Sequence, residues 1–167
     1  MPDPQWLTPE EQRAWVPLAA LLFRLPSAFD SQLQRDEGLT FASYMVLAML
    51  GEQPSRTMRM SELAAATSTS QSRISRVAGG LERAGFLGRS VDPQDGRAVL
   101  ARLTDAGLAK VQAASAGHVR AVRAAVFDRL SPEQVGQLAA IGASLIGEDW
   151  GEAIDSGRPA AAQRRGT

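Results

Sequence analysis

The stretch 70–104 constrains the fold more than any other part of this 167-residue chain. It opens with a helical pattern, SQSRISRVAGGLERAG, that ends at Gly85, where a left-handed C-terminal glycine is expected. Two short apolar segments, FLGRSV and AVLARL, follow and flank a polar turn. The stretch therefore predicts a helix, a stop and a two-stranded hairpin. The apolar face of the helix consists of Ile74, Val77, Ala78 and Leu81.

The hairpin turn, DPQDGR, is a strong local signal. It begins at Asp92-Pro93, and Asp95-Gly96 predicts the positive φ that a tight hairpin needs. Arg97 then lies near the tip, where a single arginine is well placed for the narrow minor groove of DNA. Asp95 is expected to orient the Arg97 guanidinium. The alternative is an ordinary hairpin with a surface ion pair.

The polar face of the predicted helix 70–84 carries groups that bind nucleic acid. Arginine pairs with guanine, glutamine with adenine, and serine with phosphate or base edges. The alternative is a solvated face on an amphipathic helix. Together with the turn, the candidate DNA-binding residues are Ser70, Gln71, Ser72, Arg73, Ser75, Arg76, Asp95 and Arg97.

The distribution of charge supports a nucleic-acid partner, although the formal net charge is zero. Residues 56–110 carry 9 basic and 5 acidic side chains, whereas residues 1–55 carry 3 and 7. All the basic residues of the central block except Lys110 are arginines. Arginine suits planar, bidentate contact with phosphate and guanine.

Long helices are expected before this central block. TPEE at 8–11 forms a capping box with proline at the first helical position, and Gly38 ends the helix. Pro17 and Pro26 each remove a backbone donor and are expected to kink or split it. Its apolar stripe consists of Trp15, Leu18, Leu22, Leu25 and Phe29.

The elements on either side of helix 70–84 follow from capping residues. Thr40 is expected to cap a buried helix over 41–53, and a short strand in 55–60 precedes a helix capped by Ser61. Thr104 is expected to cap a long helix that reaches about residue 130. SPEQ at 131–134 starts a last helix that runs toward Trp150, and the polar residues after it are expected to fray.

Composition excludes several function classes. The chain has no cysteine, which removes disulfides and thiol chemistry, and its single histidine, His118, argues against a transition-metal site. We expect no metal and no cofactor. The sequence offers no Ser/His/Asp arrangement, glycine-rich phosphate loop or convincing carboxylate pair, so we expect no enzyme. It lacks a signal-peptide pattern and an apolar run of about 20 residues, which predicts a cytoplasmic location.

Residues 61–107 resemble the MarR family of bacterial transcription regulators. The matching stretch is SELAAATSTSQSRISRVAGGLERAGFLGRSVDPQDGRAVLARLTDAG. Within it, Asp95-Gly96-Arg97, followed by Leu103-Thr104 and then Gly107, is similar to the wing signature of the family.

The resemblance implies a mainly α fold, in which a winged helix-turn-helix lobe with a two- to three-stranded wing sheet is flanked by long dimerisation helices. The expected division is an N-terminal dimerisation region at 1–40, a DNA-binding lobe at 41–104, C-terminal dimerisation helices at 105–155, and a flexible tail at 156–167.

The resemblance also implies a function, which is a homodimeric transcription regulator, expected to be a repressor, on a pseudo-palindromic operator in double-stranded DNA. Recognition helix 70–84 would enter the major groove, and wing 87–103 would place Arg97 in the minor groove. The glycine pair Gly79-Gly80 departs from the family pattern, which has charged or bulky residues there. The alternative is a winged-helix protein-interaction module of the anti-repressor type, without specific DNA binding.

A ligand cleft between the dimerisation helices and the DNA lobe is implied as well. A small aromatic or phenolic anion bound there would release the DNA. The residues nominated to line it are better interpreted individually as core or interface residues, and they are Trp15, Phe23, Tyr44, Met45, Met49 and His118.

Overall fold

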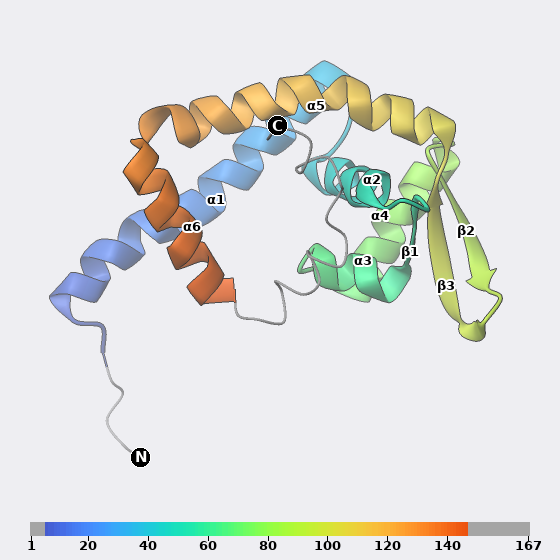
Figure 1. The fold of residues 1–167 in the computed structure, drawn as a ribbon, viewed down its shortest axis with the longest axis horizontal. Helices are drawn as coiled ribbons and strands as arrows, with labels where there is room; N and C mark the ends of the chain where they lie inside the picture. Colours follow the sequence, from blue (N-terminus) through green and yellow to red (C-terminus); the bar gives the residue numbers. More distant parts are fainter. Residues whose placement is uncertain (1–5, 147–167) are drawn as a thin grey trace, which may run out of the picture.

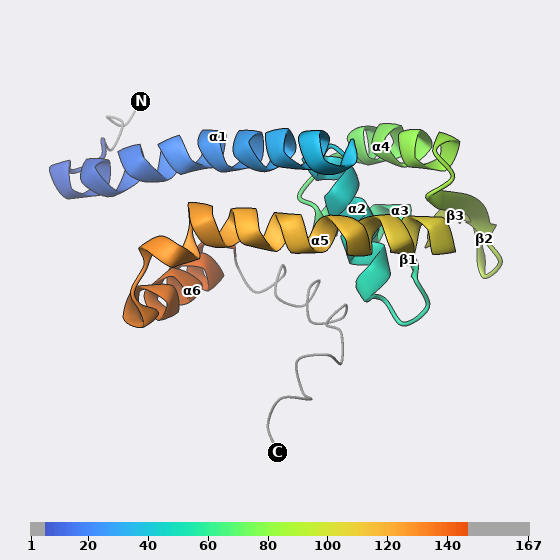
Figure 2. The same ribbon diagram turned by 90° about the horizontal axis from the view of Figure 1, so that it is seen from above.

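Two long helices, α1 and α5, lie side by side (Figures 1 and 2). The elements between them in the sequence, residues 41–104, form a small lobe at one end of the molecule (Figure 1). The computed structural model describes residues 6–146. Helix α5 runs from the lobe to α6 at the opposite end (Figure 1). The helices and strands are α1 (Pro9–Glu37), α2 (Phe41–Glu52), β1 (Thr57–Arg59), α3 (Met60–Ala66), α4 (Gln71–Arg83), β2 (Leu87–Asp92), β3 (Asp95–Leu103), α5 (Asp105–Ala125), the 3-10 helix η1 (Phe127–Arg129) and α6 (Pro132–Ile146).

Helix α1 begins and ends as its sequence predicts. The Thr8 hydroxyl accepts the Glu11 N–H, the Glu11 carboxylate accepts the Thr8 N–H, and Gly38 ends the helix with a φ of 65°. The helix is nevertheless continuous through Pro17 and Pro26, so the expected split is wrong. Both prolines are exposed, and water can therefore bond the carbonyl groups that they leave without a donor.

Two other predicted helix boundaries are wrong by a few residues. Helix α3 begins at Met60, because the Glu62 carboxylate accepts the Arg59 N–H at 2.8 Å and Ser61 is already helical. Helix α5 ends at Ala125 rather than near residue 130, and the 3-10 turn η1 follows. Trp150 and the predicted tail at 156–167 lie outside the described residues.

The sheet has three antiparallel strands in the order β1-β3-β2. The turn between β2 and β3 is Pro93-Gln94, whereas Gly96 belongs to β3 and lacks a positive φ, so the expected Asp-Gly turn is wrong. The Asp92 carboxylate accepts the Gln94 N–H at 2.9 Å. This aspartate turn, together with the fixed φ of Pro93, makes the reversal without a left-handed residue.

The core lies in the lobe and in the halves of α1 and α5 that touch it. Helix α2 is buried on several sides, as expected, and α4 turns its predicted apolar face inward. Each fully buried leucine or isoleucine stabilises this core by about 1.5–3 kcal/mol. The largest fully buried side chains are Leu33, Val46, Leu47, Leu50, Leu63 and Ile74. Among residues 6–146, no helix combines the length and the apolar character needed to cross a bilayer.

Helix α5 starts in direct contact with Gly85 and Phe86, which follow α4, the second helix of the helix-turn-helix formed by α3 and α4. The Thr104 hydroxyl accepts the Gly107 N–H at 3.0 Å and donates to the Gly85 carbonyl at 2.8 Å. A Cβ atom at Gly107 would lie 2.0 Å from the Phe86 carbonyl oxygen, a distance that real structures do not show. Position 107 therefore requires glycine for α5 to approach the lobe this closely.

We expect Gly107→Ala to lower the free energy of unfolding by about 1–3 kcal/mol, because the backbone of Phe86 has to move. Urea denaturation at fixed protein concentration measures the change. Gly136→Ala in α6 is the control, since a Cβ there meets no atom within 4 Å. That substitution should stabilise the helix by roughly 0.5–1 kcal/mol. Equal effects of the two substitutions would contradict this account of Gly107.

Candidate nucleic-acid interface

Helix α4 presents one polar face to solvent. Ser70 caps it by accepting the Arg73 N–H at 3.4 Å, while Ile74, Ala78 and Leu81 are buried on the opposite face. The five predicted DNA-binding residues on the helix are all exposed, and they are Gln71, Ser72, Arg73, Ser75 and Arg76. One face of α4 therefore packs against the core, and the opposite face leaves its polar side chains accessible to a partner.

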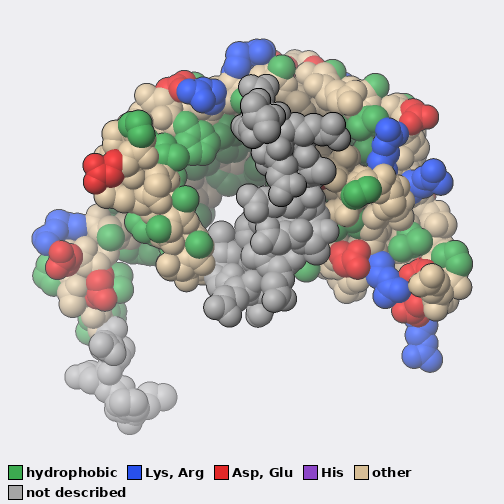
Figure 3. Space-filling view, viewed as in Figure 1, with side chains coloured by type: hydrophobic (Ala, Val, Ile, Leu, Met, Phe, Trp, Pro, Cys, Tyr) green, Lys and Arg blue, Asp and Glu red, His purple; other side chains and the backbone are tan. Residues whose placement is uncertain are grey.

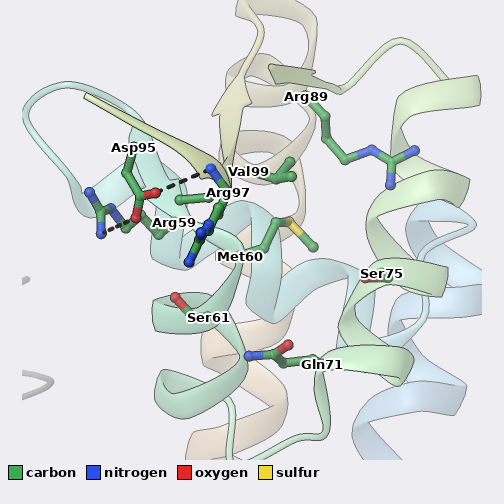
Figure 4. Close-up of a pocket in the computed structure, with 10 residues that line it drawn as sticks. Arg59, Met60, Ser61, Gln71, Ser75, Arg89, Asp95, Arg97 and Val99 are labelled. Atoms are coloured by element: carbon green, nitrogen blue, oxygen red, sulfur yellow. Dashed lines mark hydrogen bonds and ion pairs between the residues drawn. The ribbon is translucent and has the colours of Figure 1, made fainter. Parts of the chain in front are cut away.

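A polar groove of about 400 Å³ lies between this helix, the start of α3 and the wing (Figure 4). Gln71 and Ser75 line it from α4, and Asp95 and Arg97 line it from β3. The Arg97 side chain points into the groove from β3 (Figure 4). The structure therefore brings together residues that lie twenty or more positions apart in the sequence.

Asp95 does not orient the Arg97 guanidinium, so this prediction is wrong. One oxygen of the Asp95 carboxylate accepts the backbone N–H of Arg97 at 3.1 Å, and the other lies 3.8 Å from the Arg59 guanidinium. Within residues 6–146 the Arg97 guanidinium has no hydrogen bond or ion pair. Asp95 thus fixes the backbone of Arg97 and leaves its charge available.

Sequence reasoning missed two arginines that line the same groove, Arg59 and Arg89. Arg59 reaches Asp92 at 2.7 Å, and Arg89 donates from Nε to Glu82 at 2.9 Å, which ties β2 to α4. The signal available in the sequence was the presence of acidic residues around the turn and at Glu82, which could pair with nearby arginines.

The electrostatics of these pairs favour the ionised carboxylates. The Gln94 backbone N–H and then the Arg59 guanidinium hold the pKa of Asp92 below its ordinary value, against the opposing effect of burial. The hydrogen bond from Arg89 likewise lowers the pKa of Glu82. By contrast, the guanidinium groups of Arg73, Arg76 and Arg97 have no acidic partner in the described part of the chain. These three arginines are free to meet phosphate.

The glycine pair in α4 is not explained by close packing. A Cβ at Gly79 or Gly80 would meet only the ends of the flexible Arg83 and Arg89 side chains, at 3.9–4.0 Å. The helix continues through both positions. Alanine would fit at either site, and the structure shows no reason for glycine there.

A second groove, of about 750 Å³, separates α4 from α1 and α2. Its walls are mainly apolar, with two guanidinium groups at the side of α4. The residues that line it are Pro26, Ser27, Asp30, Thr40, Phe41, Ala42, Met45, Thr67, Thr69, Arg73, Ile74, Arg76 and Val77.

Only Met45 of the six predicted ligand residues lines this groove. Tyr44 and His118 instead contact each other, with ring centroids 4.5 Å apart and ring planes tilted by 52°, and burial lowers the pKa of His118. Met49 packs against the core.

The other two predicted ligand residues, Trp15 and Phe23, are 50% and 81% exposed on α1. Within residues 6–146 no cluster of three or more His, Cys, Asp or Glu side chains could hold a metal ion.

Comparison with known proteins identifies what this fold resembles. The family model described as "MarR family" matches residues 37–98. The structure of Sco3205, a MarR family transcriptional regulator from Streptomyces coelicolor in complex with DNA, is 42% identical, with a TM-score of 0.79 over 84% of this chain and 88% of that one.

Two further structures are similar over most of their length. AbsC, a MarR family transcriptional regulator from Streptomyces coelicolor, is 34% identical, with a TM-score of 0.80 over 86% of this chain and 96% of that one. CouR from Rhodococcus jostii RHA1, bound to p-coumaroyl-CoA, is 26% identical, with a TM-score of 0.68 over 77% and 88%. No curated protein sequence matches the chain.

Proposed function

Because the chain belongs to the MarR family of DNA-binding transcriptional regulators, we propose that it acts as a homodimeric repressor that a small aromatic anion releases from its operator. The family confirms the predicted winged helix-turn-helix fold, the regulatory class and the expectation that the chain is not an enzyme. The operator, the dimer, the ligand and the residues in each role are proposals.

The free cationic surface of α4 and the wing is the observation that carries the DNA-binding role. Arg73, Arg76 and Arg97 are exposed and have no acidic partner among the described residues, and Gln71 lines the same polar groove as Arg97. We assign α4 to the major groove and Arg97 to the minor groove. Ser70, Ser72 and Ser75 would make the remaining contacts to phosphates or base edges. A protein-interaction module would not need so many unpaired groups suited to phosphate and base edges.

The exposed apolar side chains of the helices outside the lobe support a dimer. Only the last third of α1 contributes buried residues, and none of residues 132–145 of α6 is buried. Hydrophobic side chains gather over these helices in Figure 3, away from the wing. Large apolar residues that are about 40% exposed or more on α1, α5 and α6 are Trp15, Val16, Leu18, Leu21, Leu22, Phe23, Val119, Leu138, Ile141 and Leu145. A second copy of the chain would cover them.

This dimer sets the proposed organisation of the chain. Residues 1–40 and 105–155 form the dimerisation region, as far as the structure describes them, and residues 41–104 form the DNA-binding lobe. Two lobes related by a twofold axis would read a pseudo-palindromic site.

The groove between α1, α2 and α4 is our candidate for the effector site. Phe41, Met45 and Val77 offer an apolar wall for an aromatic ring, and Arg73 and Arg76 offer charge for an anion. The related protein CouR binds p-coumaroyl-CoA. Arg73 would serve both the groove and the DNA surface, so an anion that engages it withdraws a DNA contact. Trp15 and Phe23 fit the dimer surface better, because they are exposed and do not line this groove.

We expect Arg97→Ala to weaken binding to every duplex. The slope of log affinity against log salt concentration should fall by about one, the value for the loss of one phosphate contact. Gln71→Ala and Arg73→Ala should instead change which base is preferred at one position of the site. The binding free energy that discriminates against the wrong base there should fall by roughly 1–3 kcal/mol. A selection from random duplexes supplies the site, and fluorescence anisotropy with excess competitor DNA measures binding.

The control for this experiment is Arg123→Ala, which removes an exposed arginine of α5 that pairs with Asp128. It should leave affinity within about twofold of the wild type, an effect on the scale of weak surface charges. Unchanged affinity in Arg97→Ala would contradict the role of the wing. If the selection enriches no sequence, the protein-interaction alternative is the better account.

We expect Leu22→Glu to convert the dimer into a monomer, because the charge would be buried without a partner. Size-exclusion chromatography with light scattering gives the molar mass. Val91→Glu on the wing is the matched control, since Val91 is 61% exposed and Leu22 is 59% exposed. A dimer that tolerates both substitutions would show that α1 does not form the interface.

We expect Ala42→Phe to prevent release by aromatic carboxylates while it preserves DNA binding, because the larger side chain fills the groove. Benzoate and p-coumarate are titrated against the protein on its labelled duplex, with anisotropy as the readout. Ala109→Phe, at an exposed position of α5 away from the groove, is the control. Release that is equally strong in Ala42→Phe would place the effector elsewhere.

A further inference from the structure

Arg59 occupies an unusual position between the sheet and the helix-turn-helix. It is the last residue of β1 and immediately precedes α3. Its guanidinium reaches across to the wing, where it contacts Asp92 at 2.7 Å and lies 3.8 Å from Asp95 (Figure 4 shows the second pair). One arginine thus joins the base of the lobe to both ends of the hairpin turn.

The two aspartates transmit this contact to the backbone of the turn. The second oxygen of Asp92 accepts the Gln94 N–H at 2.9 Å, and the second oxygen of Asp95 accepts the Arg97 N–H at 3.1 Å. Asp92 is only 8% exposed although it is charged, which makes a cationic partner necessary. Each carboxylate therefore links the Arg59 guanidinium to one N–H group of the wing.

Arg59 is poorly suited to hold DNA itself. Its single positive charge faces two carboxylates, so the cluster of Arg59, Asp92 and Asp95 carries a net charge of about −1 by the ordinary ionisation of these groups. A phosphate would be repelled from it rather than attracted. The Arg97 guanidinium, which lines the same groove, has no partner in the described chain, so its charge is available for a DNA phosphate.

We propose that Arg59 is a positioning residue of the wing: through Asp92 and Asp95 it sets the backbone from which Arg97 reaches the DNA. This inference rests on the proposed role of Arg97 in DNA binding. Loss of Arg59 would let the turn move against α3, and the free energy of placing Arg97 in the minor groove would then have to include ordering the hairpin.

A double-mutant cycle tests the proposal, with affinity for the selected duplex measured for wild type, Arg59→Ala, Arg97→Ala and the double variant. We expect Arg59→Ala alone to weaken binding by about three- to tenfold, and to weaken it no further when Arg97 is already absent. Equal fold-losses in both backgrounds would overturn the proposal, because they would indicate a contact that is independent of the wing. An unchanged affinity in Arg59→Ala would also overturn it.

Two variants separate positioning from charge. Asp92→Asn removes a negative charge near the DNA, so charge alone predicts tighter binding, whereas a loosened wing predicts weaker binding. Arg56→Ala is the matched control, since Arg56 is 41% exposed against 40% for Arg59 but pairs with Asp105 outside the wing. We expect weaker binding in Asp92→Asn and little change in Arg56→Ala; the reverse order would overturn the proposal.

Amide hydrogen exchange gives a readout that needs no DNA. We expect the Gln94 and Arg97 N–H groups to exchange at least about tenfold faster in Arg59→Ala, while amides of α4 stay protected. Unchanged exchange at the wing would overturn the proposal, and lost protection throughout the lobe would show a general structural role instead. If the wild type binds no DNA, the proposed function fails, and the exchange experiment still tests the contact.

Discussion

The close contact between the start of α5 and the end of the helix-turn-helix is the constraint on which the rest of the molecule depends. Thr104 bonds both Gly107 and Gly85, and the missing side chain at Gly107 lets the α5 backbone lie against Phe86. This junction ties the first turn of the long helix directly to the end of α4 and the start of β2. A movement of α5 would therefore be transmitted directly to the proposed DNA-binding lobe.

Five arginines of the lobe differ in whether a carboxylate within the lobe holds the guanidinium. Arg59 and Arg89 are held by carboxylates and join the wing to α3 and α4. Arg73, Arg76 and Arg97 have no such partner within the described residues, and their charge is directed outward. A count of charges along the sequence cannot make this division, because it depends on which acidic side chain lies within reach in the folded chain.

Sequence patterns predicted the elements that depend on local chemistry. The caps at Thr8 and Thr104, the glycine stop at Gly38 and the buried face of α4 all follow from nearest neighbours along the chain. The prediction was wrong where a distant or competing partner decides, as at the Pro93-Gln94 turn, where the Asp92 side chain replaces the expected glycine.

The exposure of the candidate DNA-binding residues on α4 was predictable, because they lie on the solvent face of one amphipathic helix. Their role in binding DNA stays a prediction. The groove itself could not be predicted from the sequence, because its lining depends on how α1, α2 and α4 pack together. Of the six predicted ligand residues only Met45 lines it, and their role in ligand binding stays a prediction. The periodicity of apolar residues along a helix predicts which face is apolar, but it does not predict which neighbouring helix packs against that face.

Helix α4 forms one wall of the larger groove and, on its polar side, the proposed DNA surface, with Arg73 and Arg76 at the border between the two. With the proposed roles of the two arginines, a substitution at either one that adapts the groove to a new small molecule would also alter the set of DNA sequences that the helix prefers. The signal that such a regulator detects and the genes that it controls would then not diverge independently, and both would change together after a gene duplication.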